Sequence, residues 1–237
     1  VPSEPRNVPM EWRVIDGRTA ELYQPPTPHY RVESCQRFQL FEDGIIELTF
    51  ECIPRAETWR HGYLHFFWAS YIDQPESLDI HFLGRPETDA AAPPTWARGV
   101  TPRHGELSTH RAFDDDRQFA HVEPFPLELP FSFSRYRYAE AWYFGLCRGM
   151  AFAQLFRPRD AVRIAQSPSG GGSGCPAWDF QWFIDRPQVG RRYQLVMRAV
   201  YAPLPEGADE AHVRAHVGSR VEEAHKALTP PGSVPVF

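Results

Sequence analysis

The chain has 237 residues, a formal net charge of -5 and dispersed basic residues. That pattern lacks the concentrated basic surface of a nucleic-acid-binding protein, so we do not expect nucleic acid as a partner. Apolar residues make up 42% and aromatic residues 14% of the sequence, which is typical of a globular domain with an aromatic core. No stretch approaches the roughly 20 apolar residues that span a bilayer, so no membrane partner is expected.

Strands are the main element that the sequence predicts. Residues 45–53 alternate apolar and polar side chains, as a strand with one buried face does. Residues 37–40 alternate in the same way, and Glu42-Asp43-Gly44 between the two segments favours a tight turn. These segments therefore predict a β-hairpin. Further strands are expected over 62–72, 78–83, the two halves of 142–156 joined at Arg148-Gly149, 178–184 and 192–201.

Two regions depart from this strand pattern. Residues 84–130 are rich in proline, aspartate and histidine, which predicts long loops over one face or end of the sheets. Near the C-terminus, apolar residues recur at helical spacing and predict an amphipathic helix that packs on the sheet or on a neighbour. They are Val213, Val217, Val221, Ala224 and Leu228.

The expected fold is therefore mainly all-β. We predict a large antiparallel β-sandwich or supersandwich with long middle loops and one C-terminal α-helix. A single domain is expected over 1–237, with an N-terminal extension at 1–30 and the helix and tail at 205–237.

The four cysteines are predicted to be free thiols. Cys35, Cys52, Cys147 and Cys175 show no CxxC spacing, and a chain of this size does not need disulfides to fold. The sequence begins at Val1 rather than Met, so both a cytoplasmic and an exported location are left open.

The segment from His61 to Tyr71 is the first candidate for a site. Two histidines four residues apart share a metal ion on a helix, but on a strand they lie about 13 Å apart, so no metal is expected. Alternation instead places His61, Tyr63, His65, Phe67 and Tyr71 on one face, opposite Leu64, Phe66, Trp68 and Ile72. Rings with hydrogen-bonding tips suit a sugar. The alternative is that the middle loops merely cover this face.

A second candidate is the predicted loop over residues 103–110. His104, His110 and Glu106 lie there beside Arg103 and can supply a general acid and a general base. The alternative is an ordinary solvated loop.

Carboxylates beside large rings form a third candidate. Glu140 precedes Trp142, and Asp179 lies between Trp178 and Trp182. Two carboxylates across a groove would suit glycoside hydrolysis. The alternative for Asp179, which alternation places opposite the tryptophans, is a structural hydrogen-bond acceptor for a nearby loop. The glycine-rich run at 167–174 lacks the lysine of a phosphate-binding loop and predicts a connection or a mobile rim.

Residues 62–72 (GYLHFFWASYI) and 175–184 (CPAWDFQWFI), with the serine–glycine run before the latter, resemble bacterial proteins of the galactose mutarotase-like supersandwich type. The resemblance covers about residues 37–201. It implies sugar binding in a cleft on one sheet and, in true epimerases, a histidine acid and a glutamate base that open and reclose the pyranose ring. Those catalytic positions do not map onto this shorter chain, so epimerase activity does not follow from the fold.

The leading hypothesis is a carbohydrate-binding or carbohydrate-processing protein that needs no cofactor or metal. The ligand would lie against the His61–Tyr71 face under the loop of His104. For catalysis, His65 or His104 would donate a proton to the ring oxygen while Glu106 or Glu140 removes one from the anomeric hydroxyl. Whether the protein is a sugar epimerase, a glycoside-acting enzyme or no enzyme is left open. The expected ligand contacts are His61, Tyr63, Tyr71, His110, Trp142, Arg148 and Asp179.

Two alternatives come from other functional classes. The first is a non-catalytic interaction module whose C-terminal helix docks on a partner or on a second copy in a homo-oligomer. The second is a metal-dependent enzyme whose ligands converge from separate segments at His81, His104, His110 and His121.

Overall fold

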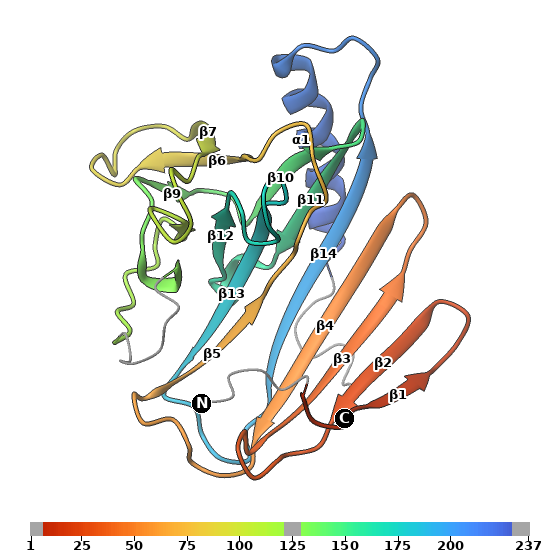
Figure 1. Cartoon of the computed structure of the whole chain (residues 1–237), viewed down its shortest axis with the longest axis vertical. Helices are drawn as coiled ribbons and strands as arrows, with labels where there is room; N and C mark the ends of the chain where they lie inside the picture. The colour runs from red at the N-terminus through yellow and green to blue at the C-terminus, as the bar shows by residue number, and fades with distance from the viewer. Residues whose placement is uncertain (1–6, 121–128, 229–237) are drawn as a thin grey trace.

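The computed structural model describes residues 7–120 and 129–228, which form two antiparallel sheets and a C-terminal helix (Figure 1). The strands are β1 (Glu11–Val14), β2 (Thr19–Gln24), β3 (Val32–Leu40), β4 (Ile45–Pro54), β5 (Tyr63–Trp68), β6 (Ile80–Pro86), β7 (Thr95–Gly99), β8 (Thr109–His110), β9 (Tyr136–Tyr138), β10 (Trp142–Cys147), β11 (Met150–Phe156), β12 (Arg163–Ser167), β13 (Ala177–Asp185) and β14 (Tyr193–Pro203). The helices are the 3₁₀ turns η2 (Leu129–Phe131) and η3 (Pro158–Asp160) and the α-helix α1 (Glu210–Lys226).

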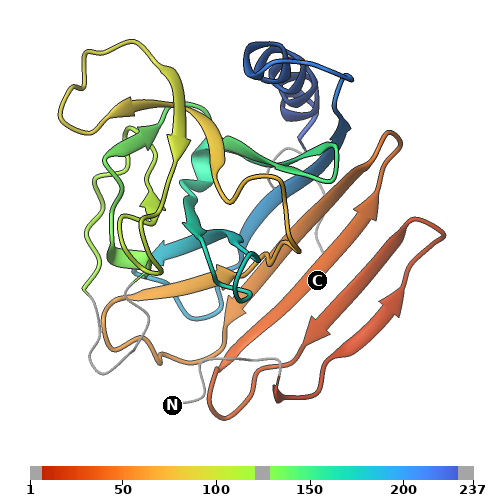
Figure 2. The ribbon, with the colours of Figure 1, turned by 45° about the horizontal axis from the view of Figure 1, so that its top comes forward.

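The strands divide between a large and a small sheet. The large sheet has ten strands in the order β1-β2-β3-β4-β14-β11-β10-β6-β7, with β9 paired to β6. The small sheet has the order β5-β13-β12-β8 and lies in front of the large sheet in Figure 1. This arrangement confirms the predicted antiparallel sandwich with a C-terminal helix. In Figure 2, β1 and β2 lie at the edge of the large sheet, away from the small sheet.

The predicted hairpin and the predicted helix are both present. Strands β3 and β4 pair in an antiparallel register, and the turn between them has positive φ at Asp43 (59°) and Gly44 (72°). Glycine adopts that conformation without steric cost. Helix α1 starts after Asp209, whose side chain accepts a hydrogen bond from the backbone N–H of His212 at 2.9 Å. Such a cap satisfies a free N–H of the first turn.

Three sequence-based expectations differ from the structure. Strand β5 ends at Trp68 rather than near residue 72, because the N–H of Ser70 bonds to the side chain of Asp179 instead of a ladder partner. The predicted loop region 84–130 contains β7 and β8, which are too short to show a clear alternation. The predicted extension 1–30 contains β1 and β2, which continue the large sheet at its edge.

Aromatic side chains fill the space between the two sheets. Leu64, Phe66 and Trp68 of β5 pack against this core, as the alternation predicted. The ring of Phe50 on β4 meets Phe66 edge-on at 4.9 Å and Trp68 at 5.1 Å between ring centroids. Such edge-to-face contacts add to the free energy gained from burial.

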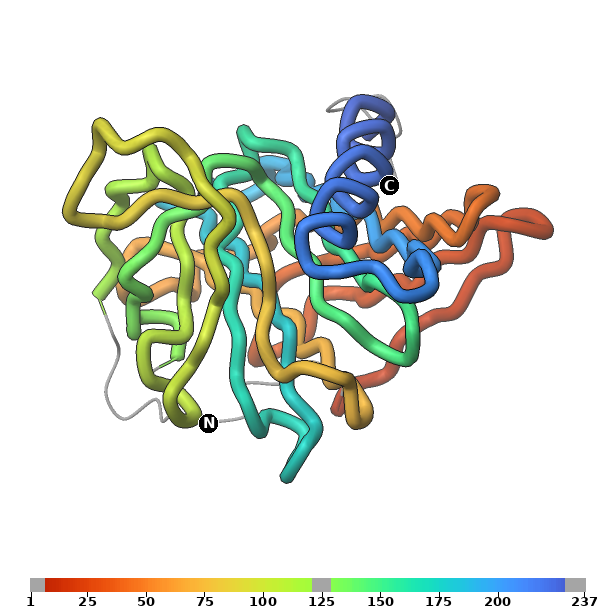
Figure 3. Tube along the Cα trace, turned by 90° about the horizontal axis from the view of Figure 1, so that it is seen from above, coloured from red at the N-terminus to blue at the C-terminus, as the bar shows by residue number. Residues whose placement is uncertain are grey.

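The opposite face of the large sheet is covered by α1 (Figure 3). Val213, Val217 and Val221 are buried there against residues of β10, β11 and β14. The apolar stripe that motivated a docking helix is therefore used within the chain. No helix among the described residues is long and apolar enough to cross a membrane. All four cysteines are free thiols, as predicted, and Cys35 and Cys52 are buried.

Gly145 of β10 in the large sheet faces Trp178 of β13 in the small sheet. Trp178 is fully buried, and a Cβ atom added at Gly145 would lie 2.3 Å from the indole ring. A rigid indole in a packed core cannot move aside easily, so glycine is needed at this position.

We predict that Gly145→Ala lowers the free energy of unfolding by about 1–3 kcal/mol, the usual cost of overpacking a core. Urea denaturation measures this change. Gly17→Ala is the matched control, since an added Cβ atom there meets nothing within 4 Å. Equal stability of the two variants would contradict the close packing described here.

Candidate functional site

The small sheet carries polar residues on the face that points away from the core. Trp178, Phe180 and Trp182 of β13 belong to the core, so the residues between them face the other way. We call the face of the small sheet that points away from the core the outer face. It contains Tyr63, His65 and Phe67 of β5, Asp179, Gln181 and Phe183 of β13, Arg163 of β12, and Thr109 of β8.

The ring of Phe183 lies at the centre of the outer face. The imidazole of His65 stacks on it at 4.2 Å between ring centroids, with an angle of 8° between the planes. The ring of Phe119 also stacks on it, at 4.4 Å and 10°. The guanidinium carbon of Arg163 lies 4.7 Å from the same ring, and this arginine is fully buried.

Residues 113–120, which we call the cover segment, close over this cluster. Asp115 accepts a hydrogen bond from Nε of Arg163 at 3.2 Å and from Nε of Arg117 at 2.7 Å. Arg117 also donates to the carbonyl oxygen of Ala161 at 2.8 Å. The Tyr63 hydroxyl donates to the carbonyl oxygen of Ala120 at 2.8 Å. The outer face is thus roofed by a middle segment, although not by the predicted loop of His104.

Three buried polar atoms beneath this cover make no hydrogen bond of normal geometry within the described residues, although the side chains of His65 and Gln181 are near enough to interact and to raise the pKa of His65. The three atoms are Nε2 of His65, Oε1 of Gln181 and Nη1 of Arg163. His65 and Gln181 lie on adjacent strands, and Gln181 is directly opposite Arg163 in the β12–β13 ladder. Buried polar atoms are nearly always paired in folded proteins, so this group is a candidate for ligand contact.

The environment moves two pKa values on the outer face in opposite directions. Burial, helped by the positive charge of Arg163 and opposed by the side chain of Gln181, lowers the pKa of His65 to about 3, so its imidazole is neutral near pH 7. Burial raises the pKa of Asp179 to about 7, although the N–H of Ser70 favours the carboxylate. That hydrogen bond, at 2.8 Å, gives Asp179 the structural role that the sequence left as an alternative.

Several predicted site residues lie on or beside the outer face. Tyr63, His65 and Asp179 are on it, as described. Nδ1 of His104 is 2.7 Å from Oγ of Ser167 at the end of β12, so the loop of His104 lies beside the small sheet. Glu106 in the same loop forms an ion pair with Arg103 at 2.6 Å.

The other predicted site residues lie away from the outer face. His61 and Glu140 are exposed and lie outside the strands. Tyr71 is exposed beside the turn that joins β12 to β13. Arg148 lies in the turn between β10 and β11, where its backbone N–H donates to Glu76 at 2.7 Å. His110 is buried against Phe82, and Trp142 is buried beneath α1.

Sequence reasoning did not assign Arg163, Gln181, Asp115 or Phe183 to the site. A single arginine among the apolar residues 161–165 was a usable signal, because a charged residue in a buried segment must find a partner. Its partner Asp115 lies 48 residues away in sequence, and nothing in the sequence connects the two.

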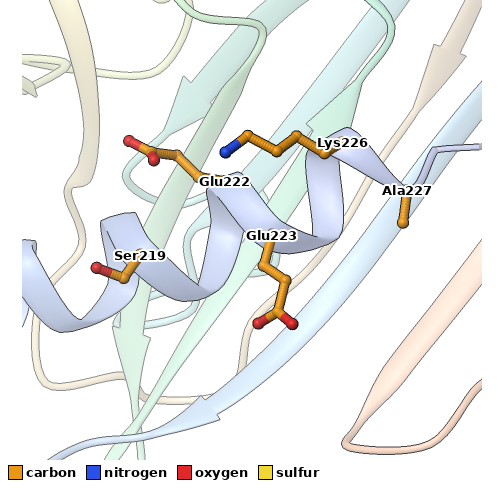
Figure 4. Close-up of a pocket in the computed structure, with 5 residues that line it drawn as sticks. All are labelled: Ser219, Glu222, Glu223, Lys226 and Ala227. Atoms are coloured by element: carbon orange, nitrogen blue, oxygen red, sulfur yellow. The ribbon is translucent and has the colours of Figure 1, made fainter.

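The described residues also form a hollow away from the outer face. This hollow of about 390 Å³ lies on the outward side of α1, where Glu222, Glu223 and Lys226 are exposed. In Figure 4, the side chains of Glu222 and Lys226 point toward one another, and that of Glu223 points away from them. Within the described part of the chain, no three histidine, cysteine, aspartate or glutamate side chains lie close enough together to hold a metal ion. His121, one of the predicted metal ligands, lies outside the described residues.

Comparison with known proteins finds likenesses of structure alone. No protein-family model and no curated protein matches the sequence. A putative aldose 1-epimerase from Escherichia coli K12 is similar with a TM-score of 0.44 and 10% identity, over 82% of this chain and 69% of that one. The GalM/aldose epimerase homologue from C. elegans is similar with a TM-score of 0.43 and 10% identity, over 83% and 69%. Both likenesses concern the fold alone.

We predict that Asp115→Asn lowers the free energy of unfolding by about 3–5 kcal/mol, because it leaves the guanidinium of Arg163 buried without its counterion. Asp73→Asn is the control, since Asp73 pairs with Arg148 where both side chains are 70% exposed and little change is expected. Chemical denaturation of the two variants distinguishes these effects. A loss for Asp115→Asn no larger than that of the control would contradict the anchoring role of Asp115.

Two buried histidines make the folded state sensitive to acid. Burial lowers the pKa of His110 to about 4 and that of His65 to about 3, so the unfolded chain binds more protons below pH 6.5. The free energy of unfolding should therefore fall as the pH drops from 6.5 towards 4, by about 1.4 kcal/mol per pH unit for each histidine. The raised pKa of Asp179 acts in the opposite direction over pH 4 to 7. Urea denaturation at pH 7, 5.5 and 4.5 should show that the free energy of unfolding falls less with decreasing pH in His110→Phe than in the native chain. An equal fall in the two proteins would contradict the lowered pKa of His110.

Proposed function

We propose that this protein binds a carbohydrate against the outer face of the small sheet, beneath the cover segment. The observation that carries the proposal is the group of buried polar atoms on His65, Gln181 and Arg163 that lack a hydrogen bond of normal geometry. A guanidinium N–H can only donate a hydrogen bond, an amide oxygen can only accept one, and a neutral imidazole nitrogen does one or the other.

A hydroxyl group satisfies such a mixed set because it donates and accepts at once. A sugar presents several hydroxyls at fixed spacing around an apolar ring. The stacked rings of His65, Phe183 and Phe119 give the outer face apolar walls next to these buried polar atoms. A charged ligand fits less well, since Arg163 already has Asp115 as its counterion.

For sugar processing, we assign the proton-transferring carboxyl to Asp179 rather than to Glu140 or Glu106. Asp179 shares the outer face with His65, whereas Glu140 is exposed outside it and Glu106 is paired with Arg103. A carboxyl with a pKa of about 7 can give and take a proton near neutral pH. The neutral imidazole of His65 then orients a hydroxyl instead of carrying charge.

The test is a thermal-shift and calorimetric screen of the protein against monosaccharides and oligosaccharides. A ligand that binds only the native state raises the melting temperature, so at least one sugar should do so. Gln181→Leu should weaken binding of that sugar at least tenfold, while Glu140→Gln, which changes an exposed carboxylate off the outer face, should leave it unchanged. Binding that survives Gln181→Leu, or no binding across the panel, would overturn the proposal.

A further inference from the structure

A cavity lies on the face of the large sheet that α1 covers, between β6, β10 and the start of α1. Its volume is about 330 Å³. Its apolar lining includes Phe144, Leu146 and Val213. A cavity of about 150 Å³ is enough for a benzene ring, so a single-ring molecule fits here.

One buried polar group in this cavity has no partner among the described residues. The side chain of His81 is 7% exposed, and its ring stacks on Phe144 at 5.0 Å between centroids. Nδ1 of His81 makes no hydrogen bond within the described structure, and Oε1 of Glu210 is 4.0 Å from it.

The charges around His81 cancel one another. Arg98 pairs with Asp79 at 2.5 Å, and Arg214 pairs with Glu210 at 2.6 Å, which gives two positive and two negative groups. Burial lowers the pKa of His81 and the guanidinium of Arg214 lowers it further, so the imidazole is neutral near pH 7. An anionic or cationic ligand would therefore lack a free counter-charge in this cavity.

A single hydroxyl group matches the gap between His81 and Glu210. An oxygen about 2.8 Å from two atoms that are 4.0 Å apart meets them at about 90°, a workable angle for one oxygen with two hydrogen bonds. The hydroxyl can accept from an Nδ1–H of His81 and donate to the carboxylate, whereas a ligand lacking it leaves Nδ1 unsatisfied.

We propose that this cavity binds a small, uncharged alcohol with a single apolar ring, whose hydroxyl bridges His81 and Glu210. The ring lies against Phe144, Leu146 and Val213. This site is independent of the carbohydrate site, because α1 covers the face of the large sheet opposite to the small sheet.

The experiment uses benzyl alcohol, toluene and benzylamine as probes of the full chain. Binding is followed by the histidine ring signals in NMR spectra and by the melting temperature. Benzyl alcohol should shift the signals of His81 and bind at least tenfold more tightly than toluene, which has the ring without the hydroxyl. Benzylamine, a cation at neutral pH, should bind more weakly than the alcohol.

The matched variants are His81→Phe, which keeps a ring on Phe144, and His29→Phe on an exposed turn. The first should reduce the affinity for benzyl alcohol to that for toluene, and the second should leave it unchanged. If His81→Phe fails to fold, the comparison of the three probes on the native chain still decides. The proposal is overturned if benzyl alcohol and toluene bind with equal affinity, if benzylamine binds more tightly than the alcohol, or if the His81 signals do not shift. None of these outcomes bears on sugar binding at the outer face.

Discussion

The burial of one guanidinium determines how the small sheet is covered. Removing a charged group from water costs several kcal/mol unless it is paired and hydrogen-bonded. Arg163 projects from the outer face of β12 with no exposed surface, and Asp115, the carbonyl oxygen of Arg117 and the ring of Phe183 surround it. The cover segment must therefore lie over the outer face for Arg163 to be tolerated there. The proposed sugar site is a consequence of that closure.

Strand β13 is buried on both faces as a result. One face packs in the core through Trp178 and Trp182, and the other lies under the cover segment through Gln181 and Phe183. Desolvation of polar groups on the second face explains both the neutral imidazole of His65 and the raised pKa of Asp179. Burial is therefore the largest cause of both pKa shifts, and the positive charge of Arg163 adds to that of His65.

Period-two alternation explains which parts of the structure could be predicted from the sequence. It identified the hairpin of β3 and β4, the core face of β5 and the outward direction of His65 and Asp179. Alternation does not say which sheet a strand joins, so it could not show that β13 and β14 separate into different sheets. It also could not reveal the pair of Arg163 and Asp115, because side chains far apart in sequence meet only through the loop between them.

The central claim is that hydroxyl groups of a sugar reach the buried polar atoms of the outer face. The most direct measurement follows the imidazole signals of all histidines by NMR while a sugar that raises the melting temperature is added. The account predicts a saturable shift of the His65 signals, with those of His81 on the far side of the large sheet unchanged. Saturable binding without any change at His65 would place the sugar elsewhere and contradict the account.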